Sequence, residues 1–523
     1  MAPKPVHIAA ILILSFVLFS SNIGGLYLYN WDEAKNSSCA REMMERHDLV
    51  LPTFNYQLRA EKPPFHYYFM IIGYRIFGVN EFAARFFSVI MGMLTVLTVF
   101  IFSAFYLSRK AAFIASIALL SSFHFILQFH MAVPDPYLIF FMTLGLFLFY
   151  SFLQHPSWAP ALLSFSSFAL GALAKGPVAI IIPAISILVY LALTRKLNEL
   201  YVYRAWLLSG IILFLAIVLP WYIMVHLRTH GEWTRMFFIR NNIDRYLSIT
   251  EGHGGPALAV PVMVLIGMLP FSLWMIQSCR LAWIKREDHQ LLLFSLVISL
   301  TTIIFFSLSQ TKLPNYTVPA YPFLAILMGW YGEKLVNGEI RRSYIGIGMF
   351  LYLTLFTCLP FVLYYLLENY PPLSGLKNLS WTFLIPAIAG VPAFFFANKK
   401  KFTEVFMILS GAWVVMSLLF FFYIFPQVDK ENPVAKALPE LNRDNTFAVY
   451  KYYNTAFPFY IKKPLIVLKD SADLAFFARA HPGAYILSTR LRMNELKAAG
   501  KFNIVSEGKD LFERNTTVVL RVK

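Results

Sequence analysis

A chain of 523 residues that is 58% hydrophobic and 17% aromatic but only 14% charged has too little polar surface to fold as one soluble globule. We therefore expect a mainly α-helical membrane protein that crosses the bilayer many times. The net charge of +17 does not imply a nucleic acid partner, because much of it falls in loops that would face anionic membrane lipids. The three cysteines are too scattered for a disulfide framework or a thiolate metal site.

Apolar runs of bilayer length predict about thirteen transmembrane helices. They cover residues 6–29, 84–106, 111–130, 136–154, 159–174, 176–194, 205–227, 257–278, 289–309, 317–336, 343–366, 379–397 and 403–425. A cleaved signal peptide is the alternative for the first run. The length of that run and the lack of a small-residue cleavage site favour a retained helix.

The basic residues of the loops predict their sidedness. Lys and Arg recur in the loops after the even-numbered runs, which places the N-terminus in the cytoplasm and the tail after Pro426 outside. The outer face then receives the loops at residues 31–85 and 228–256 and the turns at Asp135, Lys175 and Lys312. These outer loops are also rich in Lys and Arg, which indicates an anionic ligand. Side chains that snorkel from helix ends are the simpler explanation for some of them.

The first outer loop is expected to form two helices at the membrane interface. Residues 34–46 have an amphipathic pattern, with Ala40, Met43 and Met44 on one side and Lys35, Arg41, Glu42 and Glu45 around the other. Pro63 and Pro64 can begin a second helix, because proline is tolerated in a first turn. Asp32 thus lies where the first membrane helix gives way to an interfacial one.

Two aspartates of the outer face are candidate catalytic groups. Asp32 stands with Glu33 in Trp-Asp-Glu, and Asp135 stands in Val-Pro-Asp-Pro-Tyr. For each aspartate the structural alternative is the start of a helix, where an acidic residue is common. Capping does not explain the adjacent Glu33, and the shared sidedness of the two aspartates favours a reactive site.

Basic and aromatic residues of the same face are candidate ligand contacts. Lys62 lies between Glu61 and two prolines, so its structural alternative is an ion pair with Glu61. Lys175 lies in a tight turn with Gly176, which lets the backbone approach a ligand closely. Further candidates on this face are Arg240, Arg245, Glu251, His253, Lys312 and Tyr316.

The chain is expected to divide into a transmembrane domain, residues 1–426, and a soluble α/β domain, residues 427–523. After Pro426 the long apolar runs stop, and β-like segments occur at 446–451, 464–468, 484–488, 502–506 and 517–522, with helix-like stretches at 471–480 and 490–499. The sequence contains no glycine-rich nucleotide-binding loop, which favours a lipid-linked donor over a soluble nucleotide one.

Seven motifs, taken together and in order, resemble the lipid A aminoarabinose transferases. They are Trp-Asp-Glu-Ala (31–34), Ala-Arg-Glu-Met (40–43), Glu-Lys-Pro-Pro (61–64), Phe-Gly-Val-Asn-Glu-Phe-Ala-Ala-Arg (77–85), Ala-Lys-Gly-Pro (174–177), Pro-Trp-Tyr (220–222) and Lys-Leu-Pro-Asn-Tyr (312–316). These enzymes are C-type glycosyltransferases that use a polyprenyl-phosphate sugar, as are the protein O-mannosyltransferases. The resemblance implies an enzyme of the bacterial inner membrane, with its active site and tail domain on the periplasmic side.

The same resemblance implies partners and roles. The donor would be a sugar on undecaprenyl phosphate, and the acceptor lipid A or another glycolipid. The implied catalytic residues are Asp32 and Asp135, with Glu33 beside them. The implied contacts of the donor phosphate are Lys62, Arg245, Lys312 and Lys175. The implied substrate contacts are Tyr316, Lys35 and Arg240. No cofactor is required by the chemistry, but Glu61 and His253 are similar to positions that hold a metal ion in relatives, so a divalent metal ion is a further expectation.

Departures from the family pattern leave the sugar and the acceptor open. Lys35-Asn36 replaces the Arg-Tyr that usually follows Asp-Glu, and Arg59-Ala60 replaces aromatic residues before Glu-Lys-Pro-Pro. Three alternatives stay open: a protein O-mannosyltransferase-like enzyme, a transporter or flippase of lipid-linked sugars, and an anchor that presents the tail domain. A transporter would place ionisable groups near the middle of the bilayer, whereas here they crowd at one surface.

Overall fold

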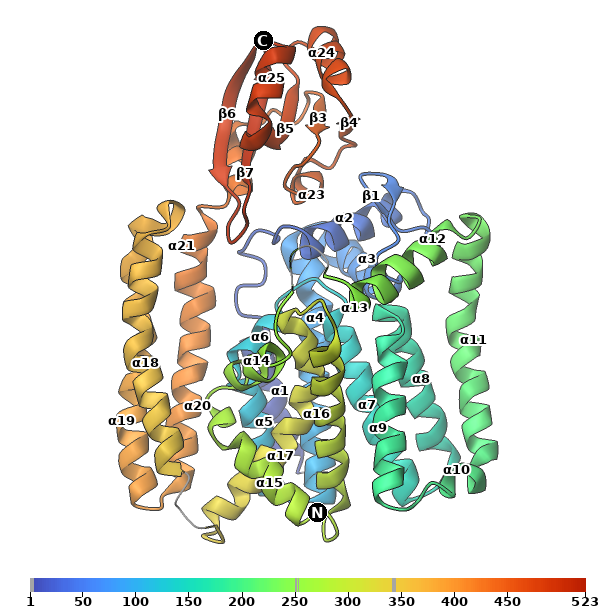
Figure 1. The fold of residues 1–523 in the computed structure, drawn as a ribbon, viewed down its shortest axis with the longest axis vertical. Coiled ribbons are helices and arrows are strands. Elements are labelled where there is room, and N and C mark those ends of the chain that lie inside the picture. Colours follow the sequence, from blue (N-terminus) through green and yellow to red (C-terminus); the bar gives the residue numbers. More distant parts are fainter. Residues whose placement is uncertain (1–3, 250–251, 253, 341–344) are drawn as a thin grey trace.

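A bundle of helices with a smaller domain at one end forms the molecule (Figure 1). The computed structural model describes residues 4–249, 252, 254–340 and 345–523. The N-terminus lies at the end of the bundle opposite the C-terminal domain (Figure 1). This arrangement agrees with the predicted opposite sidedness of the two chain ends.

The main helices of the bundle follow the apolar runs of the sequence. They are α1 (Pro5–Phe19), α4 (Glu81–Tyr106), α5 (Arg109–Leu120), α6 (Phe123–Phe129), α7 (Asp135–Gln154), α8 (Trp158–Lys175), α9 (Val178–Leu193), α11 (Arg204–Arg228), α14 (Ala259–Gly267), α15 (Met275–Ile284), α16 (Gln290–Leu308), α17 (Tyr321–Val336), α18 (Ile345–Glu368), α19 (Leu384–Asn398) and α20 (Phe402–Leu419).

Seven helices among the described residues are long and apolar enough to cross a membrane, and up to nine if each of two bent pairs counts as one span. The bent pairs are α5 with α6, at 71°, and α14 with the segment Phe271–Ile284, at 118°. A polytopic membrane protein is therefore confirmed, whereas the number thirteen stays a prediction. The first helix is also shorter than predicted: it ends at Phe19, because Asn22 adopts a φ of 54° and two glycines follow.

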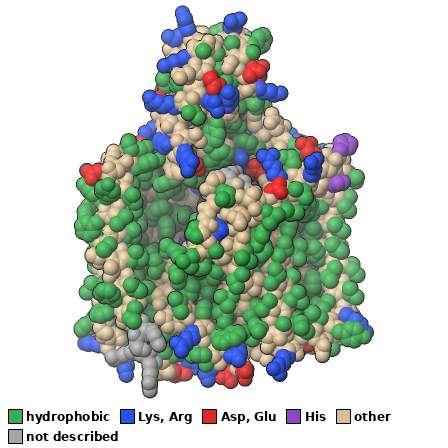
Figure 2. All heavy atoms as spheres, viewed as in Figure 1, with side chains coloured by type: hydrophobic (Ala, Val, Ile, Leu, Met, Phe, Trp, Pro, Cys, Tyr) green, Lys and Arg blue, Asp and Glu red, His purple; other side chains and the backbone are tan. Residues whose placement is uncertain are grey.

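The surface has the pattern of a protein that sits in a bilayer. Figure 2 shows hydrophobic side chains over the middle of the helical part, with Lys, Arg, Asp and Glu gathered at its two ends. Large apolar side chains such as Leu227, Phe350 and Ile388 are exposed on this belt. Exposed apolar side chains of this kind are stable in contact with lipid tails and unfavourable in water.

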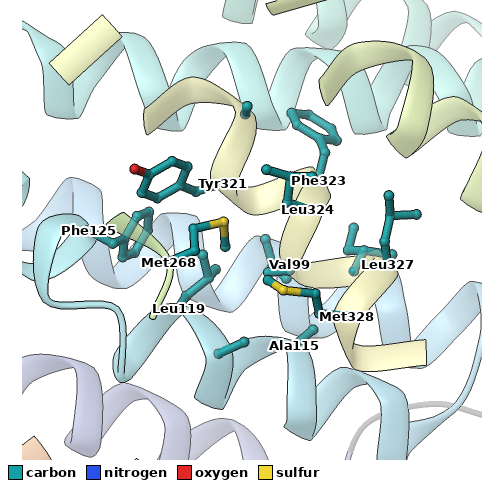
Figure 3. Close-up of a cluster of buried hydrophobic side chains, with 14 of the residues drawn as sticks. Val99, Ala115, Leu119, Phe125, Met268, Tyr321, Phe323, Leu324, Leu327 and Met328 are labelled. Atoms are coloured by element: carbon teal, nitrogen blue, oxygen red, sulfur yellow. The ribbon is translucent and has the colours of Figure 1, made fainter. Parts of the chain in front are cut away.

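The core of the bundle is a continuous cluster of buried apolar side chains. Helix α17 packs along α5, and Gly329 allows the close approach, because a Cβ atom there would lie 2.5 Å from the carbonyl oxygen of Ala111. Figure 3 shows part of this cluster, in which side chains of several helices meet: Val99, Ala115, Leu119, Phe125, Met268, Tyr321, Phe323, Leu324, Leu327 and Met328.

The first outer loop does form two helices, α2 (Asp32–Glu45) and α3 (Phe65–Phe77), with a short hairpin of β1 (Thr53–Phe54) and β2 (Gln57–Leu58) between them. An amphipathic helix at the interface would turn its charged side to water, but part of the charged side of α2 is buried. Arg41 and Glu42 are 1% and 0% exposed. Glu42 accepts hydrogen bonds from Thr53 and from the hairpin backbone, and Arg41 donates to the carbonyl oxygen of Pro458 at 3.4 Å. The C-terminal domain therefore covers α2.

The C-terminal part contains a five-stranded sheet of order β4-β3-β5-β7-β6. Its strands are β3 (Phe447–Tyr450), β4 (Ile466–Leu468), β5 (Tyr485–Thr489), β6 (Phe502–Lys509) and β7 (Thr516–Val522), and its helices include α22 (Pro433–Ala437), α23 (Phe457–Ile461), α24 (Ser471–Ala480) and α25 (Met493–Ala499). Each strand overlaps a predicted one. The division at residue 426 stays a prediction, and the last membrane helix continues through α21 (Phe425–Asp429).

Candidate active site

Asp32 is the first residue of α2, at the end of the bundle that carries the C-terminal domain. The preceding residue, Trp31, occupies the N-cap position with a φ of 72°, a conformation that a large side chain rarely adopts. Asp32 and Glu33 are the acidic residues at the start of α2. The side chain of Asp32 is partly buried. Its carboxylate lies in the first helical turn, where the positive end of the helix dipole favours a negative charge.

The charge state of Asp32 is set by cations from three segments. Burial alone would raise the pKa of Asp32, but the positive charges of Lys62, Arg59 and Arg245 lower it below its usual value, against the opposing effect of Glu61. Asp32 is thus ionised at neutral pH. It lies near two of the cations that the sequence predicts at the donor phosphate, Lys62 and Arg245.

Glu33, the neighbour of Asp32, makes structural contacts. Its side chain is 2% exposed, and its carboxylate accepts from the Nε and Nη2 atoms of Arg85 at 2.7 and 2.9 Å. It also accepts from the backbone N–H groups of Tyr29 and Ala132, at 2.8 and 2.9 Å. These contacts occupy both oxygens and join the start of α2 to α4 and to the turn before α7. They support a structural role for Glu33 in place of the predicted catalytic one.

Glu61 is held between two cations of the protein. Its Oε2 atom accepts from Arg59 Nη2 at 2.9 Å, and its Oε1 atom lies 3.4 Å from Lys35 Nζ. Burial would raise the pKa of Glu61, but Arg59, Lys35 and Lys62 lower it strongly. The ammonium group of Lys35 also lies 5.0 Å from the Trp31 ring centre. The structural alternative for Lys62 is an ion pair with Glu61, but the ion pairs of Glu61 are with Arg59 and Lys35.

The predicted metal site does not fit these contacts. Both carboxylate oxygens of Glu61 already face a protein cation, and the other expected ligand, His253, lies outside the described residues. Within the described ranges no group of three or more His, Cys, Asp or Glu side chains could hold a metal ion. A catalytic metal site needs about three protein ligands, and the described residues around Glu61 do not supply them.

Asp135 forms a second cluster with residues of two other segments. It is the first residue of α7, is 5% exposed, and its Oδ1 atom accepts from the ammonium group of Lys175 at the end of α8. The same oxygen accepts from Asn315 Nδ2 at 2.9 Å, in η3 (Pro314–Ala320). Lys175 Nζ lies 5.4 Å from the centre of the Tyr316 ring. Asp135 therefore holds Lys175 and Asn315, and Lys175 in turn lies over an aromatic ring.

Tyr316 connects the two clusters. Burial raises the pKa of Tyr316, the nearby Arg245 and Lys62 oppose this rise, and Asp135 and Asp32 add to it. Charges of this kind act over short distances, so the five groups share one neighbourhood. This geometry agrees with the prediction that acids and bases from distant parts of the sequence meet at one face of the molecule.

A cavity of about 1580 Å³ opens beside these groups. Its polar end is lined by Asp32, Lys35, Glu61, Arg240, Arg245 and Asn315. One long wall comes from α18, η4 (Pro371–Phe383) and the segment from Phe420 to Val428, and it is mostly leucine and phenylalanine. Polar residues of other segments, among them Arg85, His124 and Asp510, complete the lining. Arg240 lies in a π-helical segment (Met236–Asp244), and Arg245 begins α13 (Arg245–Leu247). The cavity thus joins a charged end to an apolar one.

One predicted ligand contact, Lys312, stands apart from this arrangement, whereas Arg240 does not. Lys312 is 8% exposed, and its ammonium group donates to the carbonyl oxygen of Ser309 at 2.6 Å. This contact directs it to its own loop, in place of the predicted phosphate. Arg240 is exposed and lines the cavity, as a substrate contact would. Sequence analysis gave no role to Asn315 and Arg59, although both lie within or beside the quoted motifs.

Comparisons with known proteins agree with this architecture. Residues 61–224 match the family described as dolichyl-phosphate-mannose-protein mannosyltransferase. A protein of Aquifex aeolicus is 31% identical over 343 residues, which are 66% of this chain and 76% of that protein. An undecaprenyl phosphate-alpha-4-amino-4-deoxy-L-arabinose arabinosyl transferase of Yersinia pestis is 29% identical over 345 residues, 64% of this chain and 61% of that protein.

The fold is that of a solved enzyme. The crystal structure of ArnT from Cupriavidus metallidurans bound to undecaprenyl phosphate superimposes with a TM-score of 0.81 at 21% identity, covering 99% of this chain and 98% of that one. Motifs, fold and relatives thus point the same way. The chain belongs to the lipid A aminoarabinose transferase-like family of membrane glycosyltransferases, which is related to the dolichyl-phosphate-mannose-protein mannosyltransferases, and it is a glycosyltransferase.

Proposed function

We propose that this chain transfers a sugar from undecaprenyl phosphate to lipid A or another envelope glycolipid. The observation that carries the proposal is the position of Asp32, whose charge interacts with those of Lys62, Arg59 and Arg245 and which lines a cavity that also has a long wall of leucine and phenylalanine side chains. A donor that joins a phosphate-linked sugar to a long hydrocarbon chain matches both ends of this cavity.

The cations favour departure of the lipid phosphate. When the bond between the anomeric carbon and the phosphate oxygen breaks, the electron pair stays on undecaprenyl phosphate, which gains negative charge. Lys62 and Arg245 stabilise this charge, and Lys175 is held nearby by Asp135. A phosphate is a stable anion once it has left, so this step needs positive charge more than a proton donor.

Asp32 acts on the incoming group. In a single displacement, the acceptor oxygen forms a bond to the anomeric carbon as the phosphate leaves, and the configuration at that carbon is inverted. An acceptor hydroxyl passes its proton to the ionised Asp32, which then acts as general base. An acceptor phosphate of lipid A is already ionised and has no proton to lose, and Asp32 then orients it through the surrounding cations.

The sidedness of the charges supports a location in the bacterial inner membrane with the site at the periplasmic face. The candidate groups lie at the end of the bundle opposite the N-terminus, which the basic loops predict to be cytoplasmic. The donor and acceptor are both lipids, so the site would receive them from the surrounding bilayer.

The positions of the buried charges favour an enzyme over a transporter. Among the described residues, buried acids and bases of the long helices lie at the helix ends: Arg85 is the fifth residue of α4, and Asp135 is the first of α7. Transporters instead place such groups near the middle of the bilayer, where the driving ion and substrate bind.

Mass spectrometry of envelope glycolipids from cells with and without the protein tests the proposal. We expect one glycolipid to gain a single sugar residue when the protein is present, and the mass difference identifies the sugar. An Asp32→Asn variant produced at the same level is the matched control. An unchanged glycolipid profile, together with no turnover of undecaprenyl-phosphate sugars by the purified chain, would refute the proposal.

A further inference from the structure

The backbone immediately before Asp32 is in an unusual conformation. Trp31 has a φ of 72° and a ψ of −113°, and it is not glycine. Residues with side chains adopt such angles only where their surroundings hold them, and these positions cluster at functional sites. What holds Trp31 therefore also fixes the direction in which Asp32 enters the cavity.

The groups that hold Trp31 come in large part from the C-terminal domain. The backbone N–H of Trp31 donates to the Oγ1 atom of Thr455 at 2.7 Å and lies 2.9 Å from Asn30 Oδ1. Asn30 Oδ1 in turn accepts from the N–H and the Oγ1 of Thr455, at 2.9 and 2.8 Å. Asn30 and Thr455 are 7% and 4% exposed, so water competes little for these bonds. The rings of Trp31 and Tyr452 pack edge to face, with their centroids 5.4 Å apart.

The residues before Trp31 are held in the same way. The N–H of Leu28 donates to the hydroxyl of Tyr460 at 2.8 Å, and the N–H of Tyr27 donates to Asp429 Oδ2 at 2.7 Å. These partners lie at the end of the last membrane helix and in α23. The extended segment that leads to Asp32 is thus fixed by partners more than 400 positions away in the sequence.

The C-terminal domain also forms part of the cavity. Tyr452, Asn454 and residues 510–515, which connect β6 to β7, line it together with Asp32. Figure 1 shows this β6–β7 connection reaching from the sheet toward the helical bundle. Leu511 packs with Leu373 and Val428 of the membrane part. The connection is therefore anchored at the mouth of the cavity.

We propose that the C-terminal domain contributes residues to the active site and that its Thr455 is a positioning residue for Asp32. This inference rests on the proposed function, in which Asp32 acts on the acceptor. Thr455 does not touch the reacting atoms; it holds Trp31 in a conformation that directs Asp32 into the cavity. A displacement of about 1 Å at such a group can cost about a hundredfold in rate.

Substitution of Thr455 in the full-length chain separates positioning from folding. Thr455→Val has nearly the same shape and lacks the hydroxyl, whereas Thr455→Ser keeps it. Thr516→Val is the matched control, since Thr516 lies on β7 and pairs with Lys509. We expect Thr455→Val to lower kcat about tenfold or more with the KM for an undecaprenyl-phosphate sugar changed by less than about twofold. Thr455→Ser and Thr516→Val should retain the wild-type kcat.

Hydrogen exchange of the peptide that contains Trp31 gives a readout independent of turnover. Loss of the Thr455 hydroxyl should speed exchange of this peptide, while Thr455→Ser and Thr516→Val leave it unchanged. Wild-type exchange and a wild-type kcat in Thr455→Val would overturn the inference. If the wild-type chain turns over no such donor, the proposed function fails, and unchanged exchange in Thr455→Val would still refute the positioning role on its own.

Discussion

Loss of the negative charge should have different effects at the adjacent acids Asp32 and Glu33. Glu33→Gln keeps the shape of the side chain but removes the negative charge that faces the Arg85 guanidinium. Asp32→Asn does the same beside Lys62 and Arg245. We expect the Glu33 variant to lose stability and the Asp32 variant to lose turnover while its fold persists.

The magnitudes follow from the contacts. The side chains of Glu33 and Arg85 are 2% and 5% exposed, and the two carboxylate oxygens accept four hydrogen bonds from Arg85, Tyr29 and Ala132. Removing one partner of a buried ion pair leaves an uncompensated charge and costs about 3–5 kcal/mol. Asp32 is only partly buried and lies near several cations, so loss of its charge should cost much less stability than loss of the Glu33 charge. A general base contributes about 10²–10⁴-fold to a rate, so the proposed role of Asp32 predicts a loss of turnover of that size.

Thermal unfolding of the purified variants in lipid nanodiscs, followed by kcat for the donor, measures both effects. Glu33→Gln should have a clearly lowered Tm, and the fraction that stays folded should turn over at a rate close to the wild type. Asp32→Asn should keep the wild-type Tm and lose turnover. The assignment is refuted if Glu33→Gln melts with the wild type yet is as inactive as Asp32→Asn.

Three further outcomes are expected. Lys62→Met should lower kcat/KM for the donor by about tenfold to a hundredfold, as expected for loss of a charge-assisted contact, while Lys110→Met at the opposite end of the bundle has no effect. EDTA should leave turnover unchanged, because both oxygens of Glu61 face protein cations; loss of turnover in EDTA, restored by a divalent ion, would contradict this. Burial raises the pKa of Asp510 to about 6, so its contribution to stability is fully present below its ordinary pKa of 3.8 and is lost as pH rises through about 6. The loss amounts to about 3 kcal/mol, and Asp510→Asn should remove this pH dependence of the unfolding free energy.

Much of the fold could be predicted from local patterns. Apolar run length located the membrane helices, and alternation located the five strands of the tail, because both patterns depend on neighbouring residues alone. The basic loops predicted which loops share a face, and Asp135, Lys175 and Asn315 do meet there through hydrogen bonds. The exact number of crossings could not be predicted in this way, since helix bends and early helix ends depend on packing.

The parts that could not be predicted depend on distant partners. The charged side of α2 is buried because Arg41 meets Pro458, 417 positions away. The different surroundings of Asp32 and Glu33 depend on Arg85, which lies 52 positions from Glu33 and forms an ion pair with its carboxylate. Amphipathic pattern and residue type carry no information about such partners. A motif could therefore identify the site region and still leave the role of each acid open.

The charge balance of the site explains why its cations should act on the transition state more than on the bound donor. The groups around the polar end of the cavity are six cations, Lys35, Arg59, Lys62, Lys175, Arg240 and Arg245, and three acids, Asp32, Glu61 and Asp135. Three positive charges are thus in excess. A phosphate that links a lipid to a sugar is a diester with one negative charge, whereas the departing lipid monophosphate carries about 1.5 to 2. The excess therefore matches the leaving group better than the substrate, and this difference in binding is what lowers a barrier. Loss of Lys62 should accordingly reduce kcat more than it raises KM, and the reverse split would show that the cation serves donor binding alone.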